Sequence, residues 1–163
     1  MKNATLVGVV IGLLVVMIGG AVWFNNSKGA KDYSALSTRD ITLLCTTDMA
    51  TEFHIHPHLD ILINGEIQAI PTGTGITSTC MHSIHTHDTS GTLHVESPVK
   101  RDFVLGDFFA VWDKTFTKDQ ILDAKADMTH KITVTVNGKV VDTYENTILR
   151  DLDKIVITST VPS

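Results

Sequence analysis

The chain has 163 residues, of which 43% are hydrophobic and 19% charged, and its formal net charge is −5 from 13 Lys and Arg against 18 Asp and Glu. This composition is ordinary for a globular protein and argues against general disorder, and the length accommodates one domain with an appendage. The basic residues are scattered, with no stripe of Lys or Arg and no interleaved aromatics. We therefore expect no nucleic acid among the partners.

The N-terminus carries an apolar stretch from Leu6 to Phe24 within a region, Asn3 to Ser27, that has no charged residue. A helix of this length rises about 28 Å, close to the thickness of a bilayer core. The sequence predicts a transmembrane signal-anchor in residues 1–27. A cleaved signal peptide is the alternative, because Gly19 and Gly20 offer small residues, although Trp23 continues the apolar run beyond them.

Two cysteines, Cys45 and Cys80, lie too far apart for a CxxC motif. In an exported domain they are expected to form a disulfide, closing a loop worth about 3 to 4 kcal/mol; metal ligation by one thiolate is the alternative. Lys residues flank the apolar stretch on both sides, so orientation rests on the cysteines. We predict a single-pass membrane protein with a linker at residues 28–40 and an extracytoplasmic domain at residues 41–163.

Alternating residues from Glu52 to Ile63 predict one half-buried strand, with Pro57 at an edge or a bulge. Asn64-Gly65 is typical of a tight hairpin turn, followed by a return strand over residues 66–70. A second predicted hairpin joins residues 83–87 to residues 92–97 through the loop 88–91. In that register His85 lies opposite His94, His87 opposite Thr92 and Ser83 opposite Glu96, so these histidines share one face.

The remaining elements complete an α+β fold. Apolar residues at helical spacing predict a short helix from Leu105 to Trp112, and Thr117 with Gln120 resembles a capping box before a second short helix. Asn137-Gly138 predicts a third hairpin between residues 131–136 and 139–144, and a last strand covers residues 155–160. We expect an antiparallel sheet of hairpins, about seven strands in all, with one or two short covering helices.

Seven of the eight histidines lie between His54 and His94, mostly at a spacing of two, which places imidazoles on one face of a strand. Imidazole binds Zn²⁺, Cu²⁺, Ni²⁺ and Fe²⁺, and three histidines with one open position form a typical catalytic zinc set. The expected metal is zinc, with copper as the alternative; one ion or two remains open. The candidate ligands are His54, His56, His58, His85, His87 and His94.

Three carboxylates, Glu96, Asp60 and Asp88, are candidates for orienting these histidines or for a general base. His82 and His130 do not fit the pattern and are not included in the site. Two other interpretations stay open: the histidines are structural, held in hydrogen bonds with those carboxylates, or they sense pH through mutual repulsion once protonated.

Several motifs of this chain together resemble a set of exported or membrane-anchored prokaryotic proteins with the pattern HxHxHL…NG…C…LHTHxxxGxxHxESP…LGxFFxxW. The matching stretches lie between Cys45 and Trp112, and the motif positions include His54, His56, His58, His85, His87, His94 and Glu96. The set has no histidine at the position of His82. It has no characterised activity, so the resemblance implies export but no function.

Three functions fit the pattern. The first is a zinc-dependent hydratase or hydrolase, by analogy of ligand set with carbonic anhydrase. The second is a protein that binds or delivers copper; with five Met and no Met-rich tract, soft Cu(I) handling is poorly supported. The third is a non-catalytic accessory subunit of a membrane complex, recruited through the segment Leu6–Phe24.

Overall fold

The computed structural model describes residues 32–47 and 51–161, and all of these except Asp32 belong to the compact unit Tyr33–Ser163. The predicted anchor at residues 1–27 lies outside the described residues. Among the residues described, no helix is long and apolar enough to cross a membrane.

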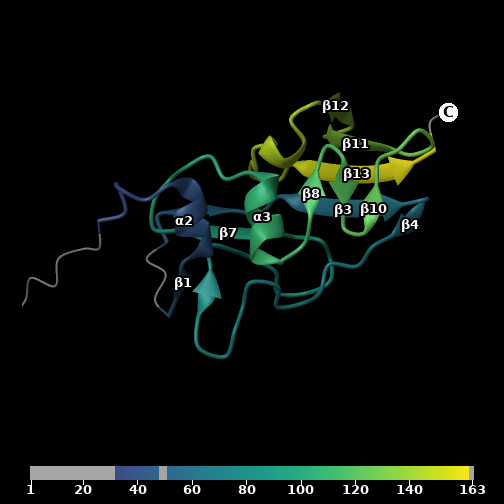
Figure 1. Ribbon diagram of the computed structural model, residues 1–163. Helices are drawn as coiled ribbons and strands as arrows, with labels where there is room; N and C mark the ends of the chain where they lie inside the picture. Colours follow the sequence, from purple (N-terminus) through teal and green to yellow (C-terminus); the bar gives the residue numbers. More distant parts are fainter. Residues whose placement is uncertain (1–31, 48–50, 162–163) are drawn as a thin grey trace, which may run out of the picture. The chain divides into compact units, whose positions relative to one another are not determined.

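The described elements confirm the α+β class, since short helices accompany largely antiparallel strands (Figure 1). The helices are α2 (Thr38–Leu43), α3 (Leu105–Val111) and the 3-10 turn η1 (Tyr144–Asn146). The described strands form four sheets: β1 (Cys45–Thr46) with β5 (Met81–His82); β2 (Phe53–Ile55), β7 (His94–Ser97) and β6 (Ile84–His85); β12 (Lys139–Val141), β11 (Lys131–Val136), β13 (Lys154–Thr160), β3 (His58–Ile63) and β4 (Glu66–Ile67); and β10 (Ala124–Lys125), β9 (Gln120–Ile121) and β8 (Phe116–Thr117).

Both Asn-Gly hairpins are present. Asn64 and Gly65 have φ of 54° and 84°, and Asn137 and Gly138 have φ of 52° and 78°. These positive angles are those of the tight turn that suits a twisted antiparallel pair, and Asn and Gly adopt them at little cost. The return strands end at Ile67 and Val141, earlier than expected.

The single strand expected from Glu52 to Ile63 is wrong, because the chain changes sheets at His56 and Pro57. β2 belongs to the sheet β2-β7-β6, whereas β3 belongs to the five-stranded sheet. Proline has no N–H to donate to a ladder. The N–H of His56 donates instead to Oδ1 of Asp151 at 2.8 Å, outside any sheet.

The expected single antiparallel sheet is also wrong. β13 lies between β11 and β3 and runs parallel to β3, with Ile157 opposite Ile61. Alternating apolar residues mark a buried face, but they carry no information about strand direction or partner. The parallel pairing of β13 with β3 joins segments that are far apart in the sequence, and no local turn signal indicates this pairing.

The helix over Leu105–Val111 is confirmed, but the second helix after Thr117 is wrong. Residues 116–121 form the hairpin β8–β9, in which Phe116 lies opposite Ile121 and both side chains are buried. The hydroxyl of Thr117 accepts a hydrogen bond from the N–H of Asp119, which closes a turn rather than capping a helix.

Ordered structure begins before Ile41, inside the linker expected at residues 28–40. Ser37 and Asp40 form a capping box at the start of α2, and the hydrogen bonds that the hydroxyl and the N–H of Ser37 donate to Oδ2 of Asp40 lower the pKa of Asp40. Tyr33 and Leu36 pack against the core. The prediction of a linker at residues 28–40 missed this ordered segment, because a short polar helix cap resembles a loop in sequence.

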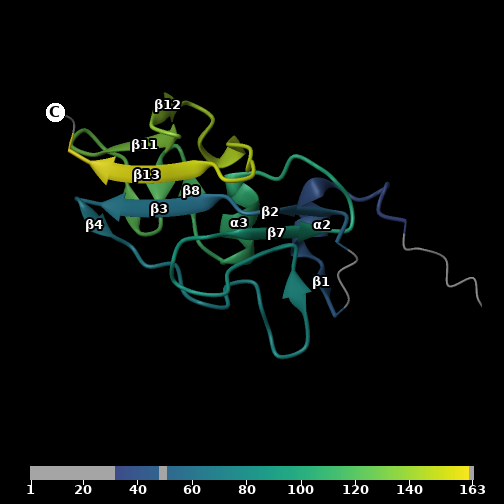
Figure 2. The same ribbon diagram turned by 180° about the vertical axis from the view of Figure 1, so that it is seen from behind.

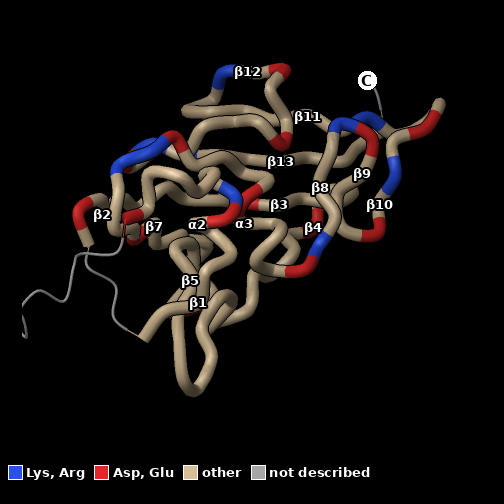
Figure 3. The backbone as a smooth tube through the Cα atoms, turned by 60° about the vertical axis from the view of Figure 1, so that its left-hand side comes forward, with Lys and Arg blue, Asp and Glu red and all other residues tan. Residues whose placement is uncertain are grey.

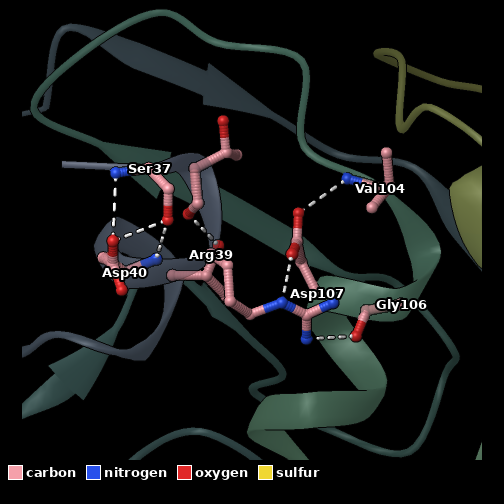
Figure 4. Close-up of polar contacts among 8 residues, drawn as sticks. Ser37, Arg39, Asp40, Val104, Gly106 and Asp107 are labelled. Carbon is pink, nitrogen blue, oxygen red and sulfur yellow. Dashed lines mark hydrogen bonds and ion pairs between the residues drawn. The ribbon is translucent and has the colours of Figure 1, made fainter.

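An ion pair joins α2 to α3 (Figure 4). Nε of Arg39 lies 3.0 Å from Oδ1 of Asp107, and Nη1 donates to the carbonyl of Gly106 at 2.7 Å. The other oxygen of Asp107 accepts from the N–H of Val104, so this buried carboxylate also fixes the start of α3. Helices α2 and α3 lie on one side of β2 and β7, which pass in front of them in Figure 2 and behind them in Figure 1.

We expect Asp107→Asn to lower the free energy of unfolding by about 1.5 to 3 kcal/mol, the range for hydrogen bonds to charged groups. Solvent at the half-exposed Arg39 screens the pair and favours the lower end. Urea unfolding measures the change. Asp119→Asn is the control, since Asp119 pairs with Lys118 on the open surface; equal losses in the two variants would contradict a specific role for Asp107.

Candidate metal centre

The sheet β2-β7-β6 has one apolar and one histidine-bearing face. Ile55, Val95 and Ile84 lie opposite one another across the three strands and are buried. Residues that face one another share a face of the sheet, and the next residues along point the other way. His85 therefore lies beside His94, and His54 beside Glu96, on the second face.

The register predicted for the second hairpin is confirmed at its centre. His85 pairs with His94, and the N–H of Glu96 donates to the carbonyl of Ser83 at 2.8 Å. The outer end differs, because Thr92 pairs with His58 rather than with His87. Pro57 turns the chain there, and β3 takes the place next to residues 91–93.

One group of potential ligands consists of His85, His87, His94 and Glu96. One ligand atom from each lies within 4.8 Å of all the others. The His94 ring is centred 4.5 Å from that of His87 and 5.6 Å from that of His85. These four side chains can hold a metal ion.

His85 is the fixed member of this group. It has no exposed surface, and Nδ1 lies 3.0 Å from the carbonyl of His82, so Nδ1 carries the proton and donates it. Nε2 then bears a lone pair, and it is buried without a hydrogen-bond partner among the described residues. A buried acceptor left unpaired costs free energy, which a bound cation would recover. A carbonyl that fixes the tautomer is a usual partner of a metal-bound histidine.

Burial is the main cause that lowers the pKa of His85, against the opposing effect of the His82 carbonyl. Burial also lowers the pKa of His94, and the neighbouring His87, His56 and His85 add to that effect. Both shifts favour the neutral imidazole, which is the state that binds metal.

A second group consists of His54, His56 and His94, again with one ligand atom each within 4.8 Å. The strand β2 is the direct neighbour of β7, so His54 and His56 lie beside the first group rather than apart from it. Nε2 of His54 lies 3.2 Å from Oε1 of Glu96, and Nδ1 of His56 lies 3.8 Å from Oδ1 of Asp151.

The other predicted site residues lie outside both groups. Nε2 of His58 contacts Oδ1 of Asp60 at 3.1 Å, so these two residues partner each other. Asp88 accepts from the N–H of Ser90, and hydrogen bonding with Ser90, first through its side chain and then through its backbone, lowers the pKa of Asp88. It shapes the loop between β6 and β7.

Two contributions were missed by sequence reasoning: the carbonyl of His82 and the carboxylate of Asp151. Main-chain acceptors leave no residue signal, and Asp151 lies 95 positions beyond His56. Residues 67–87 include no charged residue, so the tube between β4 and β5 is tan in Figure 3. The carboxylates near the histidines come from elsewhere, namely Glu96 on β7 and Asp151 before β13.

The predicted disulfide between Cys45 and Cys80 is present, with Cα atoms 5.3 Å apart. It holds β1 against β5, where Cys45 lies opposite His82. The bridge thus fixes the segment whose carbonyl orients His85, and neither thiol is free to bind metal.

No protein-family model matches the chain, and no curated protein or solved structure matches it either. The functional argument therefore rests on the geometry of the histidines.

Gly75 packs directly behind the site. Its φ is +80°, and a Cβ there would lie 2.5 Å from the carbonyl of Ile84 and 3.1 Å from Cβ of His85. We expect Gly75→Ala to lower the free energy of unfolding by about 2 to 4 kcal/mol, through backbone strain and the clash with β6.

Gly73→Ala is the matched control for that variant, because Gly73 also has a positive φ, +72°, but open space around it. We expect Gly73→Ala to lower the free energy of unfolding by about 1 to 2 kcal/mol, through the strain of a side chain at positive φ and without any clash. Thermal or urea unfolding measures both. Equal losses would mean that contact with β6 contributes nothing.

The metal-free protein should lose stability in acid as a consequence of His85. Its folded pKa lies below the usual 6.5, so the unfolded chain binds the proton more readily. The stabilisation is complete above about pH 6.5 and declines as the pH falls below it. Melting temperatures of the chelator-treated protein between pH 5 and 8 test this, with His85→Gln expected to flatten the profile.

Proposed function

We propose that the chain is a membrane-anchored, extracytoplasmic metalloprotein that holds a transition-metal ion, zinc in the first instance, through His85, His87 and His94. The observation that carries the proposal is Nε2 of His85: a buried lone pair, in a fixed tautomer, with no hydrogen-bond partner in the part of the chain that the structure describes. Three imidazole ligands are a usual zinc set that leaves a position for water.

Glu96 gives this site its chemistry. A carboxylate oxygen of Glu96 lies within 4.8 Å of a ring nitrogen of each of the three histidines, so Glu96 is near enough to accept a proton from a water bound at the site. Its Oε1 also contacts Nε2 of His54. A bound zinc ion would lower the pKa of its water ligand to about 7. We infer hydration of CO₂ or hydrolysis of an ester as the reaction class.

Metal analysis of the full-length chain, purified in detergent without chelators, tests the proposal. We expect stoichiometric transition metal with zinc predominant, and CO₂ hydration or ester hydrolysis that is lost in Glu96→Gln while metal is retained. A chain without metal would overturn the proposal. Metal without turnover would remove only the catalytic part.

Copper is the second candidate. The two groups together offer five imidazoles and no thiolate, since both cysteines are in the disulfide. Imidazole-rich sites suit Cu²⁺, which also binds more tightly than Zn²⁺ at a given nitrogen site. Retention of copper over a chelator that removes zinc, with no turnover, would favour capture or delivery of copper.

The location is a proposal that rests on the apolar segment Leu6–Phe24 and on the disulfide, which is typical of oxidising compartments. The resemblance to exported prokaryotic proteins points the same way. Membrane fractionation followed by protease treatment of intact cells tests it. We expect the chain in the membrane fraction and the domain digested from outside; a protected domain would contradict it.

A further inference from the structure

The histidine cluster contains more ligands than one ion uses. Five imidazoles and Glu96 converge on one face of β2-β7-β6, whereas a zinc site takes about four ligands. His54 and His56 are therefore not accounted for by the ion proposed at His85, His87 and His94.

The order of the strands places His94 in the middle. β7 is the central strand, with His85 and His87 supplied by β6 and its following loop on one side, and His54 and His56 supplied by β2 and its following turn on the other. The His94 ring is centred 4.5 Å from that of His87 and 4.8 Å from that of His56. His94 is the member common to the two ligand groups.

We propose that the cluster binds two divalent transition-metal ions, one at His85, His87 and His94 and the other at His54, His56 and His94, with the ring of His94 shared between them. The inference rests on the proposed function, because the first ion is the one proposed above.

The ring chemistry of His94 suits this role. An imidazole has two nitrogens that point in different directions, so one ring can bind an ion on each side once both are unprotonated. In His85, Nδ1 is occupied by a carbonyl, whereas Nδ1 of His94 is buried without a partner among the described residues. Binding of the second ion releases the remaining N–H proton of His94 to solvent, and both ions stay divalent.

The neighbouring carboxylates supply the charge that two cations require. Glu96 lies against His54, and Asp151 lies against His56 and also accepts from its backbone N–H. Two carboxylates and a deprotonated ring together balance three of the four positive charges. Partial exposure of the His54 and His56 side chains, 43% and 39%, leaves the second position open to an incoming ion.

Copper titration of the full-length chain in detergent tests the proposal, with Cu²⁺ as the probe. We expect two Cu²⁺ per chain. The electron paramagnetic resonance signal should account for much less copper than elemental analysis finds, because two Cu²⁺ ions joined by one imidazolate ring couple magnetically. The double variant His54→Gln, His56→Gln should bind one Cu²⁺ and show its full signal. The control His58→Gln should keep two coupled ions, since His58 contacts Asp60 instead.

Each other outcome is decisive. One Cu²⁺ per wild-type chain overturns the second position but leaves the proposed function standing, whereas no Cu²⁺ and no Zn²⁺ overturns both. Two ions with a full signal overturn the shared ring. Two ions in the double variant overturn the assignment to His54 and His56, provided that its melting temperature matches that of the wild type.

Discussion

His94→Ala is expected to weaken Zn²⁺ binding at least about 100-fold, the largest effect of any exchange of a single histidine. Loss of a residue that merely orients a ligand already costs 10- to 100-fold in affinity, and His94 is itself a candidate ligand of both groups. Competition with a chromophoric chelator at neutral pH measures the change.

Two other histidines provide the controls. His130→Ala removes an imidazole that contacts Asp127 and Thr129, and His58→Ala removes one that contacts Asp60. Both variants should bind Zn²⁺ within a few-fold of the wild type. If all three variants weaken Zn²⁺ binding equally, Zn²⁺ binds non-specifically to histidines over the surface, and the proposed ligands around His94 are not a specific site.

Removal of the disulfide, as Cys45→Ser with Cys80→Ser, is expected to lower the free energy of unfolding by about 3 to 4 kcal/mol. The bridge closes a loop with a sequence separation of 35, and a loop of that size gives this chain-entropy gain. Urea unfolding of the metal-free protein measures it. Reduction of the wild type should produce the same loss.

The same double variant should also weaken Zn²⁺ binding, by about 10- to 100-fold, as is usual when an orienting partner is released. β1 no longer holds β5, so the carbonyl of His82 loses its fixed place against Nδ1 of His85. If stability falls while affinity is unchanged, the segment at His82 is held in place without the bridge.

The sequence was most informative where contacts are local. Only residues 86–93 separate β6 from β7, so the pairing of His85 with His94 could be predicted from their spacing, although the loop is longer than the expected residues 88–91. The Asn-Gly turns could be predicted in the same way, because Asn and Gly adopt positive φ at less cost than most residues.

It was least informative where partners are distant. The pairing of β2 with β7 joins His54 to Glu96 across 42 positions, and nothing in either segment specifies the other. The short hairpin β8–β9 was mistaken for a helix because Thr117 and Gln120 satisfy a local capping pattern, while burial of Phe116 against Ile121 decided the outcome.

The central place of β13 determines when the domain can be completed. β3 and β11 both pair with this last strand, so each remains an open edge until residues 154–160 have emerged. Open edges are sites of unwanted pairing between chains. Asp151, which holds the backbone of His56, lies just before the same strand. The part of the histidine cluster on β2 and its following turn therefore acquires its final geometry only after Asp151 and β13 have been made, about a hundred residues later in the chain.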